Sequence, residues 1–250
     1  MNENKFNEKG KLYAQYRPCY PEDFIKYLYT EAGMTEESIL ADIGAGTGIL
    51  TKHLLEQGNT VYAVEPNTDM LENAKCYLNG FTNVIYVNSA AEHTTLPRHS
   101  IDFITVAQAF HWFDSRTFKQ ECQRILKTDG KVVLVWNSRD ETNAFSKENR
   151  AILEKYCPDF GGFSGETNAK GAEQFSNFFA NGCEERRYQN PVKFDEQRFI
   201  GYELSTSYAP RFNDKNYDDF IHSLKDIFAK YSEHDILEIP FITKSYIGTV

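Results

Sequence analysis

The sequence contains few cysteines, and their arrangement predicts neither a disulfide framework nor a metal site. Five cysteines occur in 250 residues, and no two of them form a C-x-x-C pair. An odd, scattered set of this kind is typical of free thiols in a reducing compartment. Apart from His111, the histidines also lack the spacing of metal ligands. We therefore expect a cytoplasmic protein that holds no metal.

Long apolar runs and an excess of positive charge are also missing. No apolar stretch approaches the ~18–20 residues that cross a membrane, and the polar first eleven residues do not resemble a signal peptide. Acidic residues outnumber basic ones by 36 to 27, which gives a net charge of −9 and a pI near 5.2. Nucleic acids are bound by clustered Lys and Arg, so this balance disfavours them as partners. The sequence predicts a soluble protein with no nucleic-acid, membrane or obligate protein partner.

Strand-like and helix-like segments alternate over residues 36–140. Strands are expected at residues 38–43, 61–64, 84–87, 101–106 and 131–136. Between them, helices are expected at 50–57 and 69–78, and over a third segment that carries Phe118, Cys122 and Ile125 and ends at Gly130. Such alternation predicts an α/β fold with a parallel, doubly wound sheet.

The chain is expected to form one integrated domain with three parts. Residues 1–35 are a predicted N-terminal cap, residues 36–140 the ligand-binding core, and residues 141–250 a C-terminal part that includes a lid insertion and the last two strands. Short helices are expected near 151–156 and 172–180, strands at 183–188 and 236–247, and an amphipathic helix at 217–231. Residues 1–20 and 195–232 are the candidate lid segments.

A glycine cluster follows the first predicted strand and opens the first helix. It reads G-A-G-T-G over residues 44–48, and such glycines let the backbone turn tightly and let a ligand approach the main chain. The second strand ends at Glu65, 21 residues after Gly44. That is close to the ~20-residue spacing at which an acid holds ribose hydroxyls. Together these features predict an adenine nucleoside across the carboxyl ends of the first two strands.

The spacing of the loop favours one class of nucleoside. Dinucleotide folds use G-x-G-x-x-G, whereas this loop reads G-x-G-x-G with Asp42 two residues ahead of it. A carboxylate there would repel a pyrophosphate but suits S-adenosylmethionine, which carries a sulfonium and an ammonium and no phosphate. A nicotinamide-dependent oxidoreductase and a non-catalytic S-adenosylmethionine or S-adenosylhomocysteine-binding protein remain as alternatives.

The sequence resembles class I S-adenosylmethionine-dependent methyltransferases of the type 11 small-molecule group, which includes quinone-biosynthesis and trans-aconitate methyltransferases. The resemblance covers residues 39–137 through the motifs D-I-G-A-G-T-G (42–48), V-E-P-N (64–67) and G-K-V (130–132). A-Q-A-F-H-W (107–112) and Tyr16-Arg17-Pro18 match the trans-aconitate-like branch. The resemblance implies a Rossmann-like sheet of seven strands with strand 7 antiparallel, an N-terminal cap and a helical lid insertion.

The resemblance also implies a set of cofactor contacts, position by position. Asp42 would bond the ammonium of S-adenosylmethionine directly or through water, and Glu65 would hold the ribose diol while facing a solvent-filled cleft. Tyr13 belongs to a segment that folds over the cofactor in relatives. The other implied contacts are Gly44, Ala45, Gly46, Thr47, Gly48 and Gln108 around the methionine portion, and Pro66, Met70, Ala91 and Glu92 around the adenine.

The acceptor side is expected just past the fourth strand. His111 lies where α/β ligand sites form, and a neutral imidazole there could take a proton or orient the acceptor. The chain is therefore predicted to transfer a methyl group to a small organic acceptor, with a carboxylate or a hydroxyl as the first expectation. Arg17, Arg139 and Arg211 are possible carboxylate partners. The expected substrate-binding residues are Tyr16, Arg17, His111, Trp112 and Tyr208.

Overall fold

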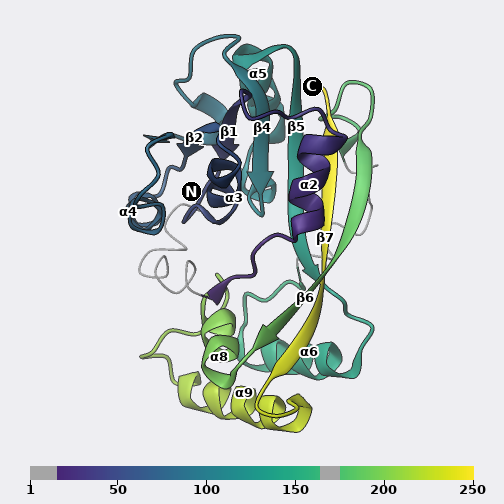
Figure 1. Ribbon diagram of the computed structural model, residues 1–250. Helices are drawn as coiled ribbons and strands as arrows, with labels where there is room; N and C mark the ends of the chain where they lie inside the picture. Colours follow the sequence, from purple (N-terminus) through teal and green to yellow (C-terminus); the bar gives the residue numbers. More distant parts are fainter. Residues whose placement is uncertain (1–15, 164–174) are drawn as a thin grey trace.

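A single mixed sheet organises the protein. The computed structural model describes residues 16–163 and 175–250. Its seven strands run in the order β3-β2-β1-β4-β5-β7-β6, and β7 is antiparallel to both of its neighbours. The other neighbouring strands pair in parallel. This confirms the predicted seven-stranded α/β sheet with an antiparallel last strand, and Figure 1 shows the strands with helices on both sides.

The central strands form because their residues can be buried on both faces of the sheet. In β5, four consecutive residues from Val132 to Val135 are fully buried, as expected of a strand covered by helices on both sides. The strands are β1 (Ile39–Ile43), β2 (Thr60–Val64), β3 (Val84–Val87), β4 (Ile101–Ala107), β5 (Leu126–Arg139), β6 (Glu184–Phe194) and β7 (Leu237–Gly248).

Helices cover the two faces of the sheet through separate apolar clusters. One cluster joins α2 and α3 to the sheet, and the other joins α5 and the aromatic residues Phe175, Phe178 and Phe179 to the opposite face. Helices α4 and α5 are capped by the preceding residues Asn67 and Asp114, whose side chains accept backbone N–H groups of the first turn. The helices of this part are α2 (Glu22–Thr30), α3 (Ile49–Glu56), α4 (Thr68–Tyr77), α5 (Ser115–Ile125) and the short 3-10 helices η2 (Ala91–His93) and η3 (Phe110–Trp112).

A second group of helices packs on a long extension of β6 and β7. These are α6 (Ala144–Tyr156), α8 (Glu196–Leu204) and α9 (Tyr217–Tyr231), and we call α8 and α9 the lid. Their apolar faces share one cluster with the far ends of the two strands, including Phe194, Leu237 and Phe241. Figure 1 shows β6 and β7 running from the sheet into this group. No helix in the described ranges is long and apolar enough to span a membrane.

Several expected boundaries were wrong. Helix α5 ends at Ile125, not near Gly130, because Leu126 already pairs with Ile101 of β4. Helix α6 is longer than the short helix expected near 151–156. It begins at Ala144, because the Asn143 side chain caps its first turn. Strand β6 continues past residue 188 to Phe194. In the segment expected to be helical at 172–180, Phe175 has 3-10 helical conformation and residues 176–180 form turns and bends, whereas residues 172–174 lie outside the described ranges.

Candidate functional site

The glycine loop joins β1 to α3 at the carboxyl end of the sheet. Gly44, Gly46 and Gly48 all have positive φ angles, of 71°, 58° and 86°, which side-chain-bearing residues rarely adopt. The N–H groups of Gly44 and Ala45 both donate to the carbonyl of Val64, at 2.9 and 3.0 Å. The loop is therefore fixed to the end of β2, the strand that delivers Glu65.

Glu65 holds the loop from the other side. Its Oε2 accepts the N–H of Gly46 and its Oε1 accepts the N–H of Asn67, each at 2.9 Å. The residue is only 8% exposed, so the expectation that it faces a solvent-filled cleft was wrong. Its carboxylate lies at the meeting point of the loop and the start of α4, where the ribose contact was expected.

We expect Glu65→Ala to weaken S-adenosylhomocysteine binding by about 1.5–3 kcal/mol, because charge-assisted hydrogen bonds are lost. It should also lower the free energy of unfolding by about 1–3 kcal/mol, since two backbone N–H groups lose their acceptor. Calorimetry and urea unfolding measure the two effects. Glu72→Ala is the matched control, because Glu72 is an exposed carboxylate on α4. Equal affinities for the Glu65→Ala variant and the native protein would contradict the assignment.

Asp42 lies beneath the loop, away from the cavities described below. Its Oδ2 accepts the hydroxyl of Thr51 at 2.6 Å, its Oδ1 accepts the hydroxyl of Thr105 at 2.8 Å, and it is 1% exposed. It therefore ties α3 to β4 and, being buried and outside the lining of both cavities, it is not open to a direct bond, whereas the alternative contact with the cofactor through water stays a prediction. Burial raises the pKa of Asp42 to about 6, although both hydroxyls favour the charged form.

This raised pKa predicts a pH dependence of stability. Because the folded pKa lies above the ordinary value, Asp42 favours the folded state at low pH and loses that contribution as pH rises through about 6. From pH 4 to pH 7 the free energy of unfolding should fall by about 2–3 kcal/mol relative to Asp42→Asn, which does not titrate there. Urea unfolding of both proteins across this range measures the difference. Parallel profiles would contradict the prediction.

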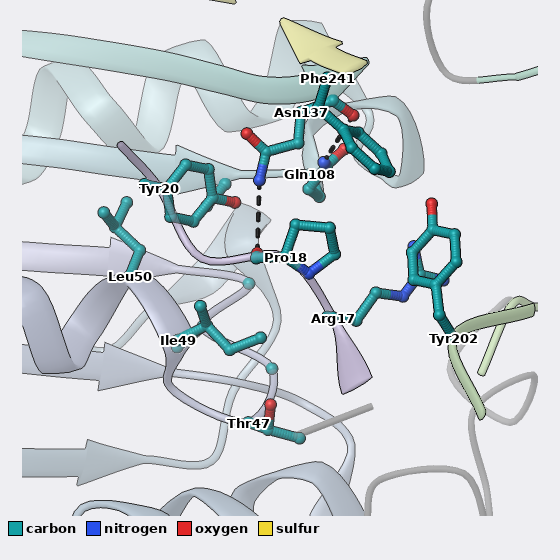
Figure 2. Close-up of a pocket in the computed structure, with 14 residues that line it drawn as sticks. Arg17, Pro18, Tyr20, Thr47, Ile49, Leu50, Gln108, Asn137, Tyr202 and Phe241 are labelled. Carbon is teal, nitrogen blue, oxygen red and sulfur yellow. Dashed lines mark hydrogen bonds between the residues drawn. The ribbon is translucent and has the colours of Figure 1, made fainter. Parts of the chain in front are cut away.

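Two adjoining cavities lie at the carboxyl end of the sheet. The smaller, which we call the loop cavity, has a volume of about 50 Å³ and is lined by residues 44–47 of the glycine loop. The larger, which we call the inner cavity, has a volume of about 250 Å³ and lies between η3, β5 and the lid. They share a wall that is formed by Arg17, Gln108, Asn137, Tyr202 and Phe241. Figure 2 shows all five side chains around the loop cavity.

Gln108 and Asn137 build this shared wall from the ends of β4 and β5. Gln108 has a φ of 59°, a strained value for a residue with a side chain, and its Nε2 donates to the carbonyl of Asn137 at 3.1 Å. The Asn137 amide donates to the carbonyls of Pro18 and Cys19, at 3.4 and 3.3 Å. The first of these bonds is dashed in Figure 2. Asn137 thus fixes the N-terminal segment that carries Arg17 over the end of the sheet.

His111 and Trp112 line the inner cavity, as expected for acceptor residues. Their ring centroids are 4.6 Å apart. His111 is exposed on one side, yet the protein atoms around its ring desolvate the charged form and lower its pKa. Solvent on the open side limits this effect. The imidazole is neutral at pH 7, the form that can accept a proton.

The other expected contacts fall into three groups. Tyr208 lines the inner cavity and Arg17 lines both cavities. Tyr16 lines neither, because its ring packs against Gly201 of α8, where an added Cβ would lie 2.5 Å from it. The residues expected around the adenine also line neither cavity, and their role stays a prediction: Pro66, Met70, Ala91 and Glu92. Tyr13 lies outside the described residues.

Arg139, at the end of β5, forms a buried ion pair inside the inner cavity wall. Its Nη2 donates to Oε1 of Glu203 at 2.7 Å, and the two side chains are 2% and 0% exposed. Burial alone would lower the pKa of Arg139, but the Glu203 carboxylate outweighs it and raises that pKa. Arg211, the third arginine proposed for a carboxylate, is exposed and does not line the cavity.

Three residues of the shared wall were not expected from the sequence. Asn137 could have been found from the sequence, because it is polar and directly follows the strand expected at 131–136, at the end of the sheet where α/β ligand sites form. No sequence pattern indicated that Tyr202 and Phe241 belong to a site, since aromatic residues of a helix and of a strand are usually core residues.

Comparison with known proteins identifies the core. A family model described as "Methyltransferase domain" matches residues 41–134. An uncharacterized methyltransferase of Mycobacterium tuberculosis is 37% identical over 148 residues, which are 59% of this chain and 58% of that protein. An uncharacterized methyltransferase of Schizosaccharomyces pombe is 33% identical over 144 residues, 57% of this chain and 56% of that protein. The matched segment thus spans less than two thirds of these relatives.

Solved structures share the fold over nearly the whole chain. A protein of Anaeromyxobacter dehalogenans with a provisional name as a type II methyltransferase has a TM-score of 0.69 at 21% identity, and the match covers 94% of this chain and 98% of that one. A phosphoethanolamine N-methyltransferase of Haemonchus contortus, solved with S-adenosylhomocysteine, has a TM-score of 0.54 at 14% identity, and covers 100% of this chain and 59% of that one. The motif-bearing residues 41–134 therefore match a methyltransferase domain, and the seven-stranded sheet with its antiparallel β7 has the fold of these solved methyltransferases.

Proposed function

We propose that this protein transfers a methyl group from S-adenosylmethionine to a small organic acceptor that carries a carboxylate or a hydroxyl. The observation that carries the proposal is the pair of adjoining cavities, one on the glycine loop and one on His111, separated by a single shared wall. A donor in the first and an acceptor in the second would meet at that wall.

The residues around the glycine loop fit S-adenosylmethionine. A Cβ added to Gly46 would meet nothing within 4 Å, so its backbone borders open space. The buried hydroxyl of Thr47 lines the loop cavity and has no partner among the described residues. Together with Glu65, these groups offer polar atoms to the methionine portion and the ribose. The bound cofactor would supply a methyl group activated by a sulfonium, and the S-adenosylhomocysteine found in the Haemonchus contortus enzyme is consistent with this.

The charge of the inner cavity favours an anionic acceptor. Among the residues that the structure describes, its lining includes Arg17 and Arg139 and no aspartate or glutamate, in a chain whose net charge is −9, and Glu203, which pairs with Arg139, is not part of the lining. Hydroxyls of Thr206, Ser207 and Tyr208 add hydrogen-bonding groups to the same wall. A volume of about 250 Å³ suits a small molecule and not a nucleic-acid strand. We therefore favour a carboxylate on the acceptor.

The chain's own contribution to the reaction is mainly positioning. Holding two reactants in line is worth up to ~7–11 kcal/mol, and an activated methyl needs neither an oxyanion hole nor a metal. The Arg17 and Arg139 side chains would fix the acceptor, and the lid would exclude water around it. The neutral His111 imidazole would orient a nucleophilic carboxylate, which carries no proton at pH 7, or accept the proton of a nucleophilic hydroxyl.

His111→Ala is expected to lower kcat by about 100-fold or more if the imidazole accepts the proton, and by less if it only orients the acceptor. Cofactor affinity should be unchanged, because His111 lines only the inner cavity. Steady-state kinetics together with calorimetry of S-adenosylhomocysteine separate the two effects. The matched control is His222→Ala, a histidine on the exposed face of α9. A variant with native kcat and acceptor KM would remove His111 from the mechanism.

The proposal is tested by incubating the protein with labelled S-adenosylmethionine and a metabolite extract, and by following S-adenosylhomocysteine release. We expect release that depends on the extract, with the label in a small carboxylic acid or hydroxylated compound. Calorimetry should show S-adenosylhomocysteine binding and no NADH binding. NADH binding in its place would favour an oxidoreductase, and tight S-adenosylhomocysteine binding without turnover would favour a non-catalytic binding protein.

A further inference from the structure

The ion pair of Arg139 and Glu203 leaves some hydrogen-bonding atoms of both side chains without a partner among the described residues. Arg139 Nη2 and the amide of Asn149 both donate to the same oxygen, Glu203 Oε1, at 2.7 and 2.8 Å. The second oxygen of Glu203 has no partner among the described residues, and neither do Nε and Nη1 of Arg139. Buried donors without acceptors are costly. The guanidinium therefore keeps unused hydrogen-bonding capacity at the edge of the inner cavity.

Aromatic rings hold this guanidinium in place. Its central carbon lies 4.7 Å from the ring centre of Phe163, 4.8 Å from that of Tyr202 and 5.9 Å from that of Phe241. Tyr202 also lies 5.3 Å from the guanidinium of Arg17. These contacts restrict the rotation of Arg139 and exclude water from it. The two arginines thus lie near the same aromatic ring, with Arg139 buried and Arg17 half-buried.

Resting on the proposed function, we infer that Arg139 is the residue that selects the acceptor, by receiving its carboxylate, and that Glu203 and Asn149 are positioning residues that hold Arg139 for this task. The acceptor class that fits is a small carboxylic acid with a flat, apolar body. Its carboxylate would take the unused N–H groups of Arg139, and its body would lie against the rings that line the cavity. Phe163 follows Gly161 and Gly162, which also line the cavity, so small backbone changes there can admit the acid.

Glu203 sets how strongly Arg139 attracts an anion. With the pair intact, the neighbouring carboxylate cancels most of the positive charge that an acceptor would meet. Replacing Glu203 by Gln keeps a hydrogen-bonding side chain and removes that opposing charge. A receptor role for Arg139 therefore predicts tighter anion binding in Glu203→Gln, whereas a purely structural role predicts only a loss of stability.

The test measures binding of benzoate and of its neutral analogue benzamide, by calorimetry with S-adenosylhomocysteine present. We expect the native protein to prefer benzoate, and Glu203→Gln to bind benzoate severalfold more tightly. The double variant Arg139→Gln/Glu203→Gln should fold, because it buries no unpaired charge, and should bind benzoate about 10–100-fold more weakly than the native protein. Its benzamide affinity should be unchanged. Arg211→Gln, which removes an exposed arginine between α8 and α9 and outside the cavity, is the control and should bind like the native protein.

Three results would overturn the inference. They are no benzoate binding to the native protein, no preference for benzoate over benzamide, and a double variant that still prefers benzoate. If Arg17→Gln alone abolished the preference, the carboxylate would lie on Arg17. Failure of the proposed function is recognised separately, because it would show as absent S-adenosylhomocysteine binding in the same calorimeter. Binding of the cofactor product with no preference for benzoate would leave the methyltransferase proposal in place.

Discussion

Replacing Arg139 by Gln should lower the free energy of unfolding by about 3–5 kcal/mol, because it leaves the Glu203 carboxylate buried without its counter-charge. Glu203 is fully buried, and the Asn149 amide alone cannot compensate the charge. The double variant Arg139→Gln/Glu203→Gln removes both charges and should recover most of this loss. Urea unfolding of the native protein, of these two variants and of Glu203→Gln gives the coupling between the two residues directly.

The matched control for Arg139 is Arg150→Gln on α6. Arg150 is in contact with Glu141 and Glu154, but its side chain is 33% exposed, so the variant should lose less than about 1 kcal/mol. A loss below this value for Arg139→Gln as well would show that water reaches the Arg139–Glu203 pair. The inner cavity would then be a hydrated channel and not a closed site.

Gly44→Ala should abolish measurable S-adenosylhomocysteine binding and cost about 2–5 kcal/mol of stability. The backbone at Gly44 has a φ of 71°, and an added Cβ would lie 2.5 Å from the Cβ of Ala109 and 3.1 Å from the ring of Phe113. Ala109 cannot turn away, because its Cβ is fixed to the backbone between β4 and η3. The strain of positive φ, about 1–2 kcal/mol, adds to an overpacking cost of about 1–3 kcal/mol. The loop must move, and the cofactor contacts move with it.

Gly80→Ala separates the steric clash from the backbone strain. Gly80 also has a positive φ, of 108°, but an added Cβ there would meet nothing within 4 Å. This variant should lose some stability and bind S-adenosylhomocysteine normally. If Gly44→Ala behaved in the same way, the contact between the loop and Ala109 would have no part in shaping the cofactor site.

The sheet could be predicted because each of its strands carries a local signal. The run of buried aliphatic residues in β5 and the glycine cluster after β1 are visible without knowledge of their partners, and the structure has both where they were expected. Strand and helix ends were less predictable. The end of α5 depends on the pairing of Leu126 with Ile101, a contact that joins residues far apart in the chain.

The site was predictable where a motif fixes the backbone, and not where distant side chains meet. His111 and Trp112 follow directly from the end of β4, and the structure places both in the inner cavity. The hydrogen bond from Asn137 to Pro18 spans 119 residues, so no local pattern indicates it. Asp42 illustrates the opposite error. A carboxylate beside a ligand loop suggests a direct ligand contact, yet Asp42 is buried and its oxygens accept the hydroxyls of Thr51 and Thr105 within the fold.

The long pairing of β6 with β7 has a consequence for how the lid can move. The ladder between these strands is continuous from Glu184↔Ile247 to Phe194↔Leu237, and β7 also pairs with β5 up to Arg139↔Phe241. The lid helices therefore adjoin the ends of two strands that belong to the central sheet. A rigid swing of α8 and α9 away from these strands would have to open the apolar cluster that they share with Phe194, Leu237 and Phe241. Sheet and lid should unfold as one cooperative unit, and exchange of small molecules should depend on side chains and short loops at the cavity rim.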